Sequence, residues 1–201
     1  MSFGENENQV DGMIKMHFES GGGSRILVHA KSELHIGECL LFDENGRKIA
    51  VKMKSRNKDN ELLDIRLGLE MIEKKNYTLK ILYRGEISTD KQHGLFRIPY
   101  SDDKKYIIAT HLQMSEARTV IPCIDVPSAK AHFDVTLIHP IGTHAVSNMI
   151  ENNISNDGKW TTSIFNRTPL MSTYLFAFVI SDFPFLERIT VKGVRVDSCI
   201  L

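Results

Sequence analysis

The residues best suited to covalent chemistry cluster around Cys123. Asp125 stands two positions after it, and His111 and His132 flank it in the sequence. A nucleophilic thiolate needs a base within hydrogen-bond reach and a lowered pKa. Neighbourhood in the sequence establishes neither condition, so we expect Cys123 to be a packed, unreactive residue. Ser172 lacks the Gly-x-Ser-x-Gly turn of a serine hydrolase, so that chemistry is not indicated either.

Metal binding is the next chemistry to consider. The chain has eight histidines, none of them in His-x-x-x-His spacing, and three cysteines (Cys39, Cys123 and Cys199) without a Cys-x-x-Cys pair. A zinc site needs three or four ligands that converge on one point. We therefore expect no metal or other cofactor in this chain. The odd cysteine count favours reduced, partly buried thiols over a disulfide framework.

The charge pattern argues against nucleic acid and membrane partners. Lys plus Arg equals Asp plus Glu at 25 each, so the chain has no net attraction for polyanions. The densest basic stretch, Lys52, Lys54, Arg56 and Lys58, occupies every second position, which is typical of the solvated face of a strand. No apolar run is long enough to span a membrane. The opening MSFGENENQV is polar and acidic, unlike a signal peptide, so the expected compartment is the cytosol.

The elements that must position these residues are predicted to be strands. At 201 residues and 42% hydrophobic content the chain suits one main domain with a substantial core. Apolar and polar residues alternate over much of its length, as in residues 77–83 and 133–137, and residues 62–69 also alternate despite their helix-forming composition. Helix is expected only as a turn around 115–118. The prediction is an all-β, antiparallel, sandwich-like domain with little helix.

Three blocks of sequence are more specific than this periodicity. In order along the chain they are LKILYRG (79–85) with GLFR (94–97) and Tyr100; THLQMSEAR (110–118) with PCIDVPSAKA (122–131); and AVSNM (145–149) with TPLMSTYL (168–175), AF (177–178) and DF (182–183). They resemble the N-terminal β-domain of aminopeptidase N-type zinc metallopeptidases, in particular the puromycin-sensitive aminopeptidase-like group. The resemblance covers nearly the whole chain from Gly12 to Val196.

The resemblance implies a saddle-shaped β-domain that packs beside a zinc-containing catalytic domain. The His-Glu-x-x-His and Gly-x-Met-x-Asn motifs of that catalytic domain are absent from this sequence. Zinc is therefore expected in the full-length family and not in this chain. The resemblance also implies that Gln113 accepts hydrogen bonds from the free α-amine of a peptide substrate, and that Cys123 packs in a tight turn. It suggests that Arg118, Asp125 and Lys130 form a polar network bracing that turn.

The expected organisation is a disordered tail over 1–11, the β-domain over 12–196 and a divergent tail over 197–201. No residue of the chain is expected to be catalytic. Two functions are compatible with the sequence. The chain is either a stand-alone or truncated, catalytically silent module that binds peptide N-termini, itself or a relative bearing a catalytic domain, or a fragment of an active zinc aminopeptidase whose catalytic domain is encoded beyond Leu201. Family relatives also leave an extracellular or membrane-associated location open.

Overall fold

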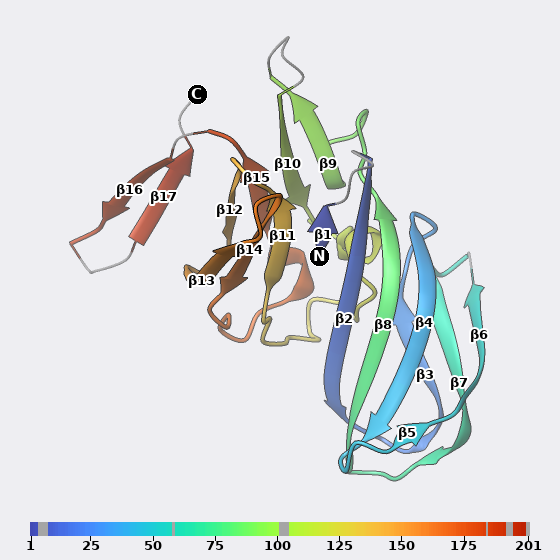
Figure 1. Ribbon diagram of the computed structural model, residues 1–201. Helices are drawn as coiled ribbons and strands as arrows, with labels where there is room; N and C mark the ends of the chain where they lie inside the picture. The colour runs from blue at the N-terminus through green and yellow to red at the C-terminus, as the bar shows by residue number, and fades with distance from the viewer. Residues whose placement is uncertain (4–7, 58, 101–104, 184, 192–194, 200–201) are drawn as a thin grey trace.

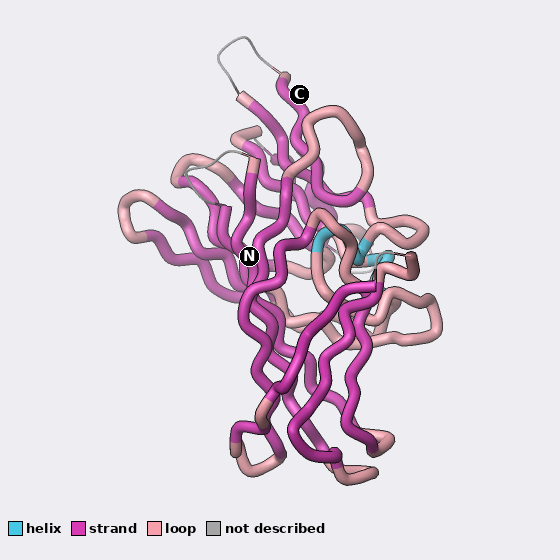
Figure 2. Tube along the Cα trace, turned by 90° about the vertical axis from the view of Figure 1, so that its right-hand side faces the viewer, coloured by secondary structure: helices cyan, strands magenta, loops and turns pink. Residues whose placement is uncertain are grey.

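The fold is almost entirely β-strand, as the alternation predicts. The computed structural model describes residues 1–3, 8–57, 59–100, 105–183, 185–191 and 195–199. In this described part, helix is limited to one α-helical turn, α1 (Ala117–Val120), and one 3-10 turn, η1 (Thr173–Leu175). Figure 2 shows both turns in cyan among the magenta strands. The helical turn predicted around 115–118 is therefore present and begins slightly later.

The largest sheet has eight strands in the order β13-β14-β11-β1-β2-β8-β4-β5 (Figure 1). All its pairs are antiparallel except β1 with β11, which run parallel where Ser2 lies opposite Ile138. Its strands are β1 (Ser2–Phe3), β2 (Gln9–Glu19), β4 (Leu34–Asp43), β5 (Lys48–Ile49), β8 (Asn76–Glu86), β11 (Thr136–Pro140), β13 (Glu151–Asn156) and β14 (Trp160–Phe165).

A three-stranded sheet, β3-β7-β6, lies behind the long strands β2, β8 and β4 in Figure 1. Its strands are β3 (Gly23–His29), β6 (Val51–Asn57) and β7 (Leu62–Met71). The ambiguous segment 62–69 is thus a strand, as its alternation predicted. Leu63, Ile65 and Leu67 are buried, whereas Leu69, near the end of the strand, is exposed.

The remaining strands form a four-stranded sheet, β12-β15-β10-β9, and a two-stranded hairpin, β16-β17. They are β9 (Gly94–Pro99), β10 (Tyr106–His111), β12 (His144–Ser147), β15 (Phe178–Ser181), β16 (Phe185–Ile189) and β17 (Arg195–Cys199). The pairing of β9 with β10 ends where Gly94 lies opposite His111, and the chain then turns towards α1.

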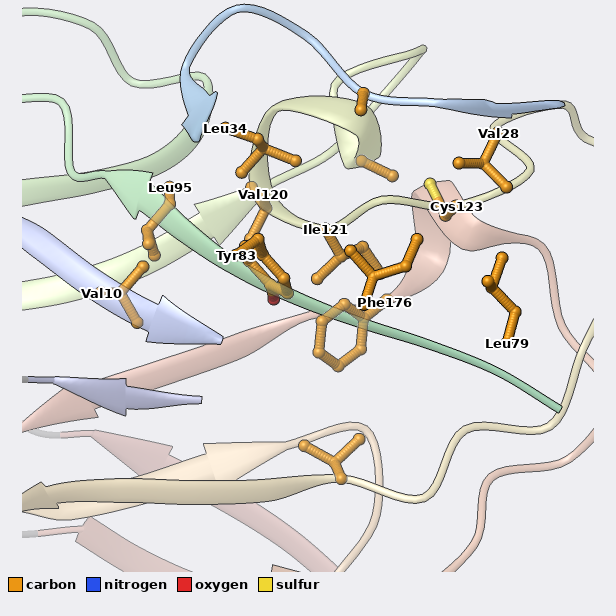
Figure 3. Packing of buried hydrophobic residues seen from close by; sticks show 14 of the residues in the cluster. Val10, Val28, Leu34, Leu79, Tyr83, Leu95, Val120, Ile121, Cys123 and Phe176 are labelled. Atoms are coloured by element: carbon orange, nitrogen blue, oxygen red, sulfur yellow. The ribbon is translucent and has the colours of Figure 1, made fainter. Parts of the chain in front are cut away.

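One buried cluster of apolar residues joins the sheets. On β8 the inward residues are Tyr77, Leu79, Ile81 and Tyr83, which reproduces the predicted alternation. Figure 3 shows Tyr83 and Leu79 in this cluster together with Phe176 from the segment after η1. The core therefore joins segments of chain that are far apart in the sequence.

The two ends of the chain differ from the expected tails. The segment 1–11 was expected to be disordered, but Ser2–Phe3 form β1, Phe3 is 3% exposed, and β2 already begins at Gln9. The apolar Phe3 explains the difference, because its burial against the Phe178 ring, 5.9 Å away, orders this end. At the other end, residues 197–199 belong to β17, and the rest of the expected divergent tail lies outside the described residues.

The register between β2 and β8 depends on a glycine. Gly12 lies opposite Tyr83, whose buried ring covers it. A Cβ at position 12 would lie 2.1 Å from Tyr83 Cζ, which is far inside van der Waals contact. The ring occupies the space that a side chain would need, so only glycine fits.

We expect Gly12→Ala to lower the free energy of unfolding by about 1–3 kcal/mol, because the added methyl group overpacks the site and displaces the Tyr83 ring. Gly21→Ala is the matched control, since a Cβ at position 21 meets no atom within 4 Å. It should change stability by less than about 0.5 kcal/mol. Urea unfolding of the three proteins measures both effects, and equal midpoints would contradict the packing role of Gly12.

Candidate functional site

Gln113 stands in the turn between β10 and α1. Its side chain is exposed and makes no hydrogen bond to any residue that the structure describes. The turn itself is fixed, because Leu112 is 2% exposed and its carbonyl accepts a hydrogen bond from the Glu116 amide at 3.1 Å. The peptide bond from Gln113 to Met114 is cis. The chain thus presents a free amide group from an anchored loop.

The anchor of this loop is an ion pair between Arg118 of α1 and Asp125. Arg118 Nε lies 2.9 Å from Asp125 Oδ2, the Arg118 backbone amide donates to the same oxygen at 3.2 Å, and Arg118 Nη2 donates to the Asp125 carbonyl at 3.0 Å. The Asp125 side chain is 2% exposed and that of Arg118 is 13% exposed. A carboxylate so deeply buried requires this set of donors.

Three further segments converge on the pair. Thr173 Oγ1 of η1 donates to Asp125 Oδ1 at 3.0 Å, and Arg118 Nη1 donates to Glu61 Oε2 at 3.1 Å. Lys31 extends the network, because its Nζ lies 3.6 Å from Glu116 and 3.8 Å from Glu61. Burial alone would lower the pKa of Arg118, but its hydrogen bonds to Asp125 and Glu61 outweigh burial and raise it. The guanidinium is therefore held charged. We call Arg118, Asp125, Glu61, Thr173 and His29 the Asp125 cluster.

His29 completes the cluster as a hydrogen-bond acceptor. Its Nδ1 accepts from the Asp125 backbone amide at 3.2 Å, so this nitrogen carries no proton. Burial, followed by the nearby positive charge of Arg118, lowers the pKa of His29. Both observations favour a neutral imidazole, which serves to position Asp125.

Cys123 is a packing residue, as expected. It is 4% exposed, and burial raises the pKa of its thiol well above the ordinary value. Its backbone bonds in both directions with His29, at 2.8 and 3.1 Å, and Figure 3 shows its sulfur in the core near Val28. His132 donates instead to the Thr168 carbonyl at 2.9 Å. Nothing among the described contacts activates the thiol.

The hydroxyl groups near the cluster also have structural roles. Ser172 Oγ donates to the Pro127 carbonyl at 2.6 Å, and Thr168 Oγ1 accepts from the Phe133 amide at 2.9 Å. Both residues are buried. The Ser172 bond holds the segment before η1 against the loop 121–127, and the Thr168 bond holds it against the stretch before β11. The Ser172 hydroxyl is therefore already bonded and is not placed to attack a substrate.

Sequence reasoning identified part of the network. Arg118 and Asp125 are joined as expected, but Lys130 is exposed and forms no ion pair with the described residues. Arg118 alone supplies the cation that pairs with Asp125 among the described residues. His29, Glu61 and Thr173 were missed. Thr173 is 48 positions and His29 is 96 positions from its partner Asp125, and Glu61 is 57 positions from its partner Arg118. At these separations no local sequence pattern could have revealed them.

The described residues contain no group of three or more His, Cys, Asp or Glu side chains placed to hold a metal ion. Within the same part of the chain, no helix has the length and apolar character needed to cross a membrane. A zinc ion would thus find no ligand set among these residues.

Comparison with known proteins gives a consistent result. A family model described as the peptidase M1 N-terminal domain matches residues 3–175, which include Gln113 and the whole Asp125 cluster. The chain is 34% identical over 142 residues to aminopeptidase N of Homo sapiens and 36% identical over 145 residues to aminopeptidase Q of Homo sapiens. It is also 34% identical over 163 residues to aminopeptidase N of Haemonchus contortus.

These alignments cover 68%, 69% and 79% of the chain but only 15%, 14% and 17% of the respective relatives. The chain thus spans a small fraction of the length of the relatives it matches.

Asp125→Ala should lower the free energy of unfolding by about 3–5 kcal/mol, because it leaves the Arg118 guanidinium buried without its carboxylate. Asp134→Ala is the matched control. Asp134 pairs with Arg167 at 2.9 Å, but both side chains are about two-thirds exposed (64% and 65%), so its loss should cost no more than about 1 kcal/mol. Thermal and urea unfolding measure the free energy of unfolding of both variants. A similar decrease for the two would contradict the central role of Asp125.

Proposed function

Because the chain belongs to the peptidase M1 N-terminal domain family, we propose that it is a non-catalytic module that recognises the free α-amine of a peptide through Gln113. The family is zinc-dependent, and the described residues provide no metal-ligand group. The chemistry of bond cleavage would therefore belong to a catalytic domain, encoded further along the same polypeptide or carried by a relative. The relatives named aminopeptidase support peptide N-termini as the ligand class.

The observation that carries this proposal is the contrast between Gln113 and its surroundings. Its amide group is exposed and unbonded among the described residues, while Leu112 and Arg118 on either side are fixed. An anchored acceptor oxygen can receive a hydrogen bond from an ammonium group with little loss of side-chain freedom. The rigid loop therefore serves to place one acceptor.

Nuclear magnetic resonance of the chain, titrated with leucinamide, tests the proposal. We expect the backbone amide signals of the loop from Leu112 to Glu116 to shift with leucinamide and not with N-acetyl-leucinamide, which has no ammonium group. Gln113→Ala should abolish the response. Gln113→Glu should strengthen it several-fold, because a carboxylate adds the attraction of opposite charges to the hydrogen bond that the ammonium group already donates.

Gln92→Ala provides the local control, since Gln92 is also exposed and its carbonyl lies 3.3 Å from His111 Nδ1. It should leave the titration unchanged. Equal shifts with the acetylated compound, or an undiminished response in Gln113→Ala, would rule out amine recognition by this residue.

We further propose that the segments tied together by the Asp125 cluster form a docking face for a protein partner. Four apolar residues, Leu112, Met114, Val120 and Ile121, lie in or next to the loop of Gln113, and of these only Met114 is exposed, at 78%. The other three point into the core. The exposed apolar residues of these segments are Ile124, Val126, Leu170 and Leu175. Together with Met114 we call them the loop face. Exposed apolar residues grouped around a rigid centre are typical of protein interfaces.

The isolated chain should self-associate in sedimentation velocity runs across a concentration series, because the loop face then has only other copies to cover it. A double substitution, Met114→Glu and Leu170→Glu, should weaken this association at least about tenfold by placing charges in the interface. Ile72→Glu is the control, since Ile72 is 65% exposed in the turn after β7. A wild type that stays monomeric at high concentration would contradict the docking face.

A further inference from the structure

Strands β4 and β6 lie side by side, and each has a stretch of edge that pairs with no other strand among the described residues. The short strand β5 pairs with β4 only at Leu41 and Phe42, so the β4 stretch from Leu34 to Gly37 has no strand neighbour on that side among the described residues. Strand β6 is the last strand of the three-stranded sheet. Figure 1 shows β6 beside β4 at the margin of the molecule. An unpaired strand edge is a template for another strand.

Two basic side chains of β6 reach across to the β4 edge. Lys54 Nζ donates to the carbonyls of Ile36, at 3.3 Å, and Gly37, and Arg56 Nη2 donates to the carbonyl of Leu34. The sequence had suggested that these residues form a solvated face. Lys54 is exposed, in agreement with this, and Arg56 is partly buried, but both also occupy carbonyl acceptors that would otherwise pair with the amides of a neighbouring strand. They therefore keep the edge closed to chains that cannot displace them.

The space between the edges is an open depression of about 310 Å³, lined by residues 34–36, 54–56 and Leu63. Neither Lys54 nor Arg56 forms an ion pair with the described residues. Burial lowers the pKa of Arg56, and the nearby charge of Glu33 offsets this effect only in part. A carbonyl compensates a desolvated cation less well than a carboxylate does. The partly buried Arg56 would thus gain from a ligand that brings a carboxylate, and the exposed Lys54 offers a second positive charge beside it.

We propose that an extended, acidic peptide segment of another protein adds to the β4 edge between Leu34 and Gly37. Its backbone amides bond to the Leu34 and Ile36 carbonyls, while Lys54 and Arg56 turn to its carboxylates. Lys54 and Arg56 occupy alternate positions of a strand, and an extended peptide presents alternate side chains at the same spacing. The ligand therefore carries acidic residues at every second position. This site is separate from Gln113 and does not depend on the proposed amine recognition.

The probe is the peptide Thr-Val-Glu-Val-Glu-Val-Thr, acetylated and amidated so that it has no free amine for Gln113. Calorimetric titration into the wild-type chain should show saturable binding, at least about tenfold tighter than that of the same peptide with lysine in place of glutamate, because like charges repel across the site. A version N-methylated at every backbone amide should bind at least about tenfold more weakly, since it has no N–H group to donate to a strand edge.

Charge reversal by Lys54→Glu with Arg56→Glu should invert the preference in favour of the lysine peptide. Lys15→Glu, at an exposed position on β2, should leave it unchanged. The two modified peptides are tested on the wild type, so the proposal remains testable if the double variant does not fold.

Equal binding of the glutamate and lysine peptides, equal binding of the N-methylated peptide, or no binding at millimolar concentration would each overturn the proposal. Sedimentation runs could also overturn it. If self-association is lost in the variant with Lys54→Glu and Arg56→Glu but not in the one with Met114→Glu and Leu170→Glu, a second copy of the chain occupies the edge.

Discussion

The burial of one carboxylate determines how the middle of this chain is arranged. Asp125 is almost inaccessible to water, and a charge in that position persists only if several donors satisfy it. Arg118 and Thr173 donate to this carboxylate, so the helical turn α1 and the turn η1 are held to it. The Asp125 backbone amide donates to His29 and ties the end of β3 to the same residue. Three segments of the chain are therefore positioned around Asp125.

The polar residues around Asp125 fall into two groups, those whose side chains are buried or bonded within the fold and those whose side chains are exposed and can contact a ligand. Cys123, Ser172 and His29 are the types that perform catalysis elsewhere, yet here their sulfur, hydroxyl and imidazole groups are buried or already bonded. Gln113 is the opposite case, since its neighbours are fixed and its amide is exposed. This division agrees with the proposed function, in which the chain positions a ligand without changing its covalent bonds. It also agrees with the lack of a metal-ligand group among the described residues of a chain whose family is zinc-dependent.

The sequence predicted the fold class well because alternation depends only on which face of a strand is buried. The alternation in residues 77–83 and 62–69 correctly predicted strands, in the second segment despite a helix-forming composition. The site was less accessible. The local pair Arg118 and Asp125 could be predicted, but Glu61, His29 and Thr173 reach it through the topology of the sheets. Ser2–Phe3 were also mispredicted, because one buried aromatic ring outweighs a polar neighbourhood.

The basic row on β6 shows why a charge pattern alone does not assign a role. Arg118 and Arg56 are both partly buried guanidinium groups that bond to backbone carbonyls, but only Arg118 also has carboxylate partners among the described residues. The first is therefore complete, and removing its partner can only cost stability. The second has hydrogen bonds and feels the charge of Glu33, but no described carboxylate lies within ion-pair distance of it, so its environment improves when a carboxylate binds directly. An arginine side chain thus stabilises the fold at position 118 and is available to a ligand at position 56. The difference lies in the partners of each guanidinium group rather than in the sequence around it.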